Sequence, residues 1–70
     1  MNNRYIIGFN TWPRDIDIAI TAINTYGGKI IDEIPRINAI VVIIPDAAIE
    51  DIRKDSNVKY IEIDQEVRIM

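Results

Sequence analysis

The side chains that come closest to a chemical site are two carboxylates near the C-terminal end of the chain, Glu62 and Asp64. In an extended strand these positions lie on one face, about 7 Å apart, a separation also found between the two acids of some glycosidases. A solvated strand edge explains the pair better, because 70 residues without an aromatic sugar platform give a glycosidase site little support. A third interpretation makes the carboxylates acceptors for free backbone N–H groups at helix N-termini of a partner protein.

The other residue types argue against catalysis by this chain. It has no histidine and no cysteine, so it lacks the usual general base, the thiolate nucleophile and the commonest transition-metal ligands. Ser56 is the only serine, and the chain has no base that could activate it as a triad histidine does. Gly27 and Gly28 follow a predicted helix instead of opening one, which is typical of a helix stop and not of a phosphate-binding loop. We therefore expect no enzyme activity, no cofactor and no metal site.

The size and charge of the chain limit its possible partners. Seventy residues form a single domain, residues 1–70, and a hydrophobic content of 49% indicates a folded core. Eight basic and eleven acidic residues leave a net charge of −3, which argues against nucleic acid as a partner. The longest apolar run, residues 39–44, is far shorter than the roughly 20 residues of a membrane-spanning helix. We expect neither nucleic acid nor a membrane as a partner.

The order of strand and helix patterns predicts the fold. Runs of β-branched and aromatic residues predict strands over residues 4–9, 29–34, 38–44 and 58–64. A helix is predicted over residues 13–26, with a core-facing apolar stripe of Ile16, Ala19, Ile20 and Ile23. A second helix of about three turns is predicted after Pro45, with Asp46 as its N-cap and residues 55–57 as its end. This order is that of the α+β ferredoxin-like βαββαβ fold, a four-stranded antiparallel sheet with two helices on one face.

The centre of the predicted sheet is apolar on both faces. Residues of the third strand alternate in direction, so Ala39, Val41 and Ile43 point away from Ile40, Val42 and Ile44. A two-layer domain needs only one apolar face, and a large exposed apolar patch usually marks an interaction site. Docking on a different protein, cover by loops and pairing of two copies into a homodimer all account for this pattern.

Four segments of the chain, in order, are similar to those of one known family. They are residues 4–9 (RYIIGF), 27–30 (GGKI), 48–55 (AIEDIRKD) and 58–64 (VKYIEID). In these segments the chain resembles the propeptides of subtilisin-like serine proteases and the related small proteinase inhibitors. The resemblance implies that the helix-free sheet face packs on two parallel helices of the protease. It also implies that Glu62 and Asp64 accept hydrogen bonds at the N-termini of those helices.

The same resemblance implies a role for the C-terminal residues. Residues 65–70 would lie in the active-site cleft as an extended, product-like tail, and the final residue would correspond to the self-cleavage site. Met70 would fill the primary specificity pocket and Val67 the hydrophobic pocket three residues upstream. Arg68 and Ile69 would add strand-type backbone pairing.

The function expected from the resemblance is that of an inhibitor and intramolecular chaperone of a subtilisin-like serine protease. The chain would be secreted as part of a protease precursor, or cytoplasmic if it is a free-standing inhibitor. The alternative is a ferredoxin-like regulatory or self-associating module that uses the apolar sheet face for dimerisation or for a small ligand.

Overall fold

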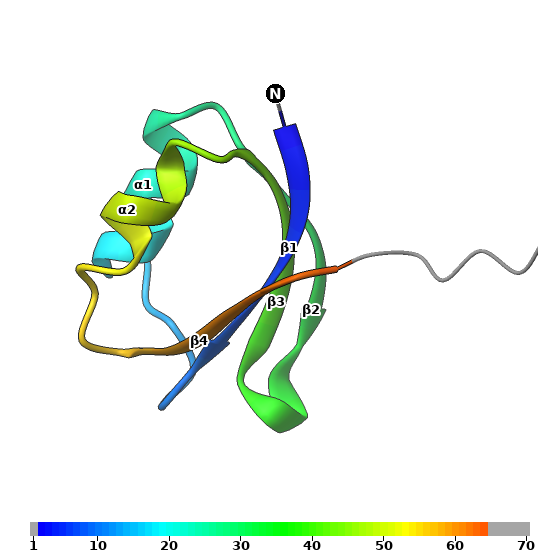
Figure 1. Ribbon diagram of the computed structural model, residues 1–70. Helices are drawn as coiled ribbons and strands as arrows, with labels where there is room; N and C mark the ends of the chain where they lie inside the picture. Colours follow the sequence, from blue (N-terminus) through cyan, green and yellow to red (C-terminus); the bar gives the residue numbers. More distant parts are fainter. Residues whose placement is uncertain (1, 65–70) are drawn as a thin grey trace, which may run out of the picture.

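The computed structural model describes residues 2–64, in which four strands and two α-helices form two layers (Figure 1). In chain order the elements are β1 (Asn2–Phe9), α1 (Ile18–Thr25), β2 (Lys29–Ile34), the short 3-10 helix η1 (Pro35–Ile37), β3 (Ala39–Pro45), α2 (Ala48–Ile52) and β4 (Val58–Ile63). The strands form one antiparallel sheet in the order β2-β3-β1-β4. This topology confirms the predicted ferredoxin-like fold, with β1 and β3 at the centre of the sheet.

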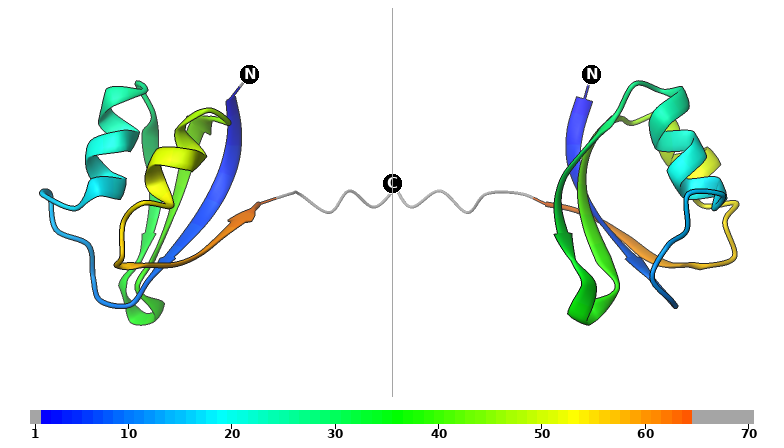
Figure 2. Two further views of the ribbon diagram at one scale, coloured as in Figure 1. Left: turned by 60° about the vertical axis from the view of Figure 1, so that its left-hand side comes forward. Right: turned by 180° about the vertical axis from the view of Figure 1, so that it is seen from behind.

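Both helices pack together on the same face of the sheet, as the two views of Figure 2 show. The core between the layers comprises Tyr5, Ile7 and Phe9 of β1, Ile40, Val42 and Ile44 of β3, Ala19, Ile20, Ala22 and Ile23 of α1, and Ala48, Ile49 and Ile52 of α2. Since the chain has no leucine, isoleucine supplies most of this volume. Each fully buried isoleucine contributes roughly 1.5–3 kcal/mol relative to an exposed one. Among residues 2–64 no helix is long and apolar enough to cross a membrane.

Helix α1 begins at Ile18, so the predicted start at residue 13 is wrong. Asp17 has an extended backbone, and its carboxylate accepts hydrogen bonds from the backbone N–H of Arg14 and from Nδ2 of Asn57, both at 3.1 Å. These bonds hold the residues before α1 as a loop. Ile16, which the pattern places in the core, lies in this loop and is 73% exposed.

The C-terminal end of α1 confirms the predicted glycine stop. Gly27 has a φ of 71°, in the left-handed region that glycine adopts without a steric penalty. Its N–H donates to the carbonyl oxygen of Asn24 at 3.1 Å, and the N–H of Gly28 donates to that of Ile23 at 2.7 Å. This pair of bonds satisfies two terminal carbonyls of the helix and turns the chain into β2.

Helix α2 spans only five residues, and the prediction that Asp46 caps it is wrong. The Asp46 carboxylate instead accepts hydrogen bonds from the hydroxyl of Tyr5 at 2.7 Å and from Nδ2 of Asn3 at 2.6 Å. The Tyr5 hydrogen bond is the main cause that lowers the pKa of Asp46, and the same bond raises the pKa of Tyr5. The carboxylate therefore joins the loop before α2 to β1, and this geometry leaves α2 without a side-chain cap.

Asn57, in the loop after α2, connects that loop to the one before α1. Its Oδ1 accepts hydrogen bonds from the backbone N–H and the hydroxyl of Thr11 at 3.0 and 3.2 Å, and its Nδ2 donates to the Thr11 carbonyl at 3.0 Å. Nearby, the buried carboxylate of Asp55 accepts the backbone N–H of Ala19 at 3.1 Å. Asp55 thus supplies from a distant loop the N-terminal cap that α1 lacks locally.

Candidate functional site: the helix-free face of the sheet

The face of the sheet opposite the helices is defined by the strand register. Because Tyr5 and Val42 are paired and point into the core, their neighbours Ile6 and Val41 point to the opposite side. We call this side the open face. It is formed by Arg4, Ile6 and Gly8 of β1, Lys29, Asp32 and Ile34 of β2, Ala39, Val41 and Ile43 of β3, and Tyr60 and Glu62 of β4. In the part of the chain that the structure describes, no helix covers it (Figure 2).

The centre of the open face is apolar, which confirms that apolar residues point to both sides of the sheet. The exposed fraction differs strongly along β3: Val41 is 5% exposed because its neighbours in the sheet shield it, whereas Ile43 is 36% exposed. Ile6 is half-buried between them and β4. The exposed apolar area of the open face is therefore concentrated around Ile43, Ile6 and the Tyr60 ring.

Gly8 and Tyr60 form a close contact on this face. The two residues are opposite each other in β1 and β4, and a Cβ atom at position 8 would overlap the ring of Tyr60. The glycine therefore lets the aromatic ring lie close against the central strand, a known way of filling the space above a strand glycine. The sequence pattern does not single out Tyr60, because the contact depends on the register of two strands that are far apart in the chain.

The two carboxylates proposed from the sequence lie at one end of the open face. Glu62 is opposite Ile6 and is exposed, and no hydrogen bond or ion pair involves its carboxylate among residues 2–64. Asp64 is less exposed, and its Oδ2 lies 2.7 Å from Nε of Arg4. The backbone N–H of Asp64 also donates to the Arg4 carbonyl at 2.9 Å. The structure thus brings the two acids to one face but gives them different surroundings.

Val67, Arg68, Ile69 and Met70, with the rest of the tail over 65–70, are outside the described residues.

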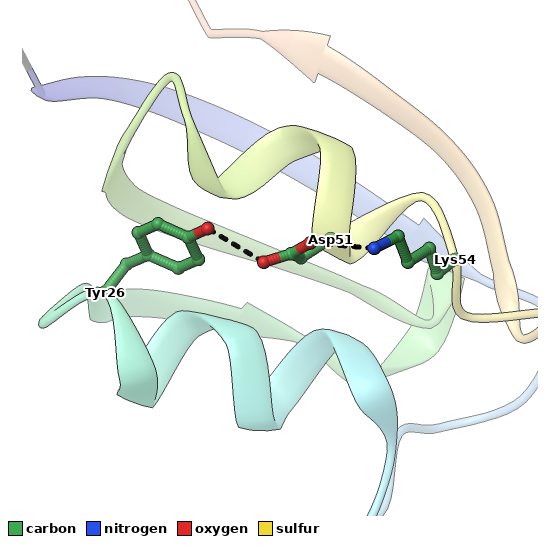
Figure 3. Close-up of polar contacts among 3 residues, drawn as sticks. All are labelled: Tyr26, Asp51 and Lys54. Atoms are coloured by element: carbon green, nitrogen blue, oxygen red, sulfur yellow. Dashed lines mark hydrogen bonds and ion pairs between the residues drawn. The ribbon is translucent and has the colours of Figure 1, made fainter.

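A second polar group lies between the helices, away from the open face. The hydroxyl of Tyr26 donates to Oδ2 of Asp51 at 2.8 Å, and Nζ of Lys54 lies 3.2 Å from Oδ1 (Figure 3). The Tyr26 hydrogen bond is the main cause that lowers the pKa of Asp51, and this bond raises the pKa of Tyr26. These contacts tie the end of α1 to α2. They border an open groove of about 260 Å³ lined by Ile16, Ile18, Thr21, Ala22, Thr25, Asp51 and Lys54.

Among residues 2–64, the open face is the surface that fits contact with another protein. Within residues 2–64 no group of three or more acidic, histidine or cysteine side chains could hold a metal ion. The open face instead combines an apolar centre with an accessible carboxylate, Glu62, at its border. A small α+β domain with such a face is typical of a module that binds a partner protein.

Comparison with protein families identifies the class of module as a protease prodomain. The model of the fervidolysin N-terminal prodomain matches residues 1–64. The chain belongs to this family, whose members are propeptide domains of subtilisin-like proteases and are not themselves catalytic. No curated protein matches the chain. The family confirms the resemblance noted in the sequence and implies association with a cognate protease domain.

Proposed function

We propose that this domain inhibits its cognate subtilisin-like protease by docking with the open face and placing its C-terminal tail in the active-site cleft. The observation that carries the proposal is the position of Glu62 and Asp64 beside the apolar centre of the helix-free face, in a chain of the prodomain family. An apolar surface bordered by carboxylates is complementary to a pair of helices whose N-termini carry free N–H groups.

In this proposal the two acids fix the orientation of the domain on the protease. A carboxylate near a helix N-terminus stabilises the contact by about 0.3–1 kcal/mol, and by more when the contact is partly buried. Glu62 is well placed for this role because its carboxylate is exposed and has no partner among residues 2–64. Asp64 has one oxygen on Arg4 and its other oxygen available as an acceptor.

The tail supplies inhibition. Met70 occupies the primary specificity pocket, Val67 the hydrophobic pocket upstream, and Arg68 and Ile69 pair as a strand with the cleft. A folded domain bound next to the cleft holds the tail at high effective concentration, so that a cleaved end stays bound and dissociates slowly.

The same docking surface supports a second role during folding. A domain that binds the native protease surface also binds the folding transition state that resembles it, and so lowers the barrier to folding. The domain is then an intramolecular chaperone, carried to the cell exterior as part of a secreted precursor.

Docking through the open face can be tested separately from tail insertion. The test measures the dissociation constant of the 70-residue chain on a subtilisin-like protease whose cleft is filled by a covalently attached peptidyl inhibitor. We expect Glu62→Gln to raise this constant about two- to fivefold, the loss expected for one helix-terminal carboxylate. The matched control is Glu50→Gln, because Glu50 is an exposed acid of α2 on the helix side. Equal effects of the two substitutions would contradict docking by the open face.

A further inference from the structure

We infer that Arg4 is a positioning residue that fixes the point at which the C-terminal tail leaves the sheet. The inference rests on the proposed tail insertion, and it assigns different roles to Glu62 and Asp64. Glu62 faces the partner, whereas Asp64 is held mainly by Arg4 and so sets the start of the tail.

Asp64 is attached to β1 at two points. Its backbone N–H donates to the Arg4 carbonyl at 2.9 Å, and its carboxylate lies 2.7 Å from Nε of Arg4. These contacts continue the β1–β4 register by one residue beyond the pair of Tyr5 and Ile63, where β4 ends. The last residue that the structure describes is therefore fixed through its backbone and its side chain together.

Arg4 belongs to one of the two central strands of the sheet. β1 is paired with β3 on one side and β4 on the other, and Arg4 itself is opposite Ile43 of β3. A residue of a central strand has little freedom to move, because both neighbours constrain its backbone. The position of Asp64, the residue before the tail, is therefore set by a rigid part of the domain.

The exposure of the pair indicates that its role is not mainly one of stability. The side chains of Arg4 and Asp64 are 45% and 26% exposed, and ion pairs at such positions contribute little to the free energy of unfolding. A fixed starting point affects binding of the tail more than it affects the stability of the domain, because the effective concentration of a tethered segment depends on where its tether begins. Loss of the ion pair should weaken inhibition while the domain stays folded.

The experiment compares Arg4→Gln with the unchanged 70-residue chain as inhibitors of a subtilisin-like protease. We expect the inhibition constant to rise about fivefold, the effect of losing one half-exposed ion pair. The control is Arg53→Gln, because Arg53 is an exposed cation at the end of α2, on the helix side and away from the open face. It removes the same charge and should leave the inhibition constant within twofold.

Two further backgrounds separate positioning from direct contact with the protease. In a Met70→Glu chain, whose tail no longer fits the primary pocket, Arg4→Gln should have no further effect. Asp64→Asn should add less than its own full effect to Arg4→Gln, because both substitutions remove the same ion pair. The inference would be overturned if Arg4→Gln weakened inhibition equally in the unchanged and the Met70→Glu chains. It would also be overturned if the effects of Arg4→Gln and Asp64→Asn on inhibition were fully additive.

The anchor can also be measured without a protease. Amide hydrogen exchange at Asp64 should be faster in Arg4→Gln than in the unchanged chain, while exchange at Ile7 in the middle of β1 should stay the same. Unchanged exchange at Asp64 would show that the Arg4 side chain does not hold Asp64 in place. If the unchanged chain does not inhibit the protease at all, the proposed function fails and the role of Arg4 in inhibition fails with it, whatever the exchange result.

Discussion

The ring of Tyr60 in β4 lies directly over Gly8 in β1, in space that a methyl group on Gly8 would occupy. The Tyr60 ring fills the space on the open face between β1 and β4, and it can do so only because residue 8 has no side chain. One residue in the central strand thus decides how an aromatic side chain of the edge strand lies on the open face.

Gly8→Ala should destabilise the domain by about 1–3 kcal/mol, because the added methyl group overlaps the Tyr60 ring and forces it to move. Chemical denaturation measures the loss. In a Tyr60→Leu background the same substitution should cost much less, since the smaller side chain can move aside. If the losses of stability from Gly8→Ala and Tyr60→Leu are simply additive, the Tyr60 ring does not restrict the side chain at position 8.

Asn57→Ala should lower the free energy of unfolding by about 2 kcal/mol, since it removes several hydrogen bonds between the loops around α1 and α2 at about 1 kcal/mol or less each. Thermal unfolding followed by circular dichroism measures the change. The matched control is Asn24→Ala, because Asn24 is an exposed residue of α1 whose side chain makes no hydrogen bond among residues 2–64. A loss of equal size in both variants would show that Asn57 does not join the loops.

The stability of the domain should fall in acid through Asp51. The hydrogen bond from Tyr26 holds the pKa of Asp51 below its ordinary value near 4, so the folded protein loses this contribution as the pH falls from the unfolded value through the folded one. Tyr26→Phe should therefore destabilise the domain at pH 6 and have a smaller effect at pH 3. Urea denaturation at both pH values measures the two differences. A difference that does not shrink in acid would contradict the link between Tyr26 and Asp51.

The sequence pattern is enough to predict the four strands, because each strand is a local run rich in β-branched and aromatic residues. The predicted range 29–34 coincides with β2, and the glycine stop after α1 is also local. The start of α1 could not be predicted, since Asn57, forty residues further along the chain, holds Asp17 in the preceding loop. The cap expected from Asp46 failed for a similar reason, because Tyr5 of β1 binds its carboxylate.

The candidate site, too, could be predicted from the sequence only in part. Alternation places Glu62 and Asp64 on one face, and the register of β4 on β1 brings both to the helix-free side. The difference between the two acids could not be predicted, because it depends on the pairing of Arg4 with Asp64, sixty residues apart. Long-range contacts that join two correctly predicted strands decide which carboxylate is accessible and which is held.

Inhibition of a subtilisin-like protease through the C-terminal tail is tested most directly by one titration. The 70-residue chain should inhibit a subtilisin-like protease that accepts methionine in its primary pocket, competitively with a peptide substrate and at micromolar concentration or below. Met70→Glu should weaken the inhibition by at least about tenfold, since a buried carboxylate cannot replace methionine in an apolar pocket without a large cost. No inhibition by the unchanged chain at micromolar concentrations, or equal inhibition by the Met70→Glu chain, would contradict the account.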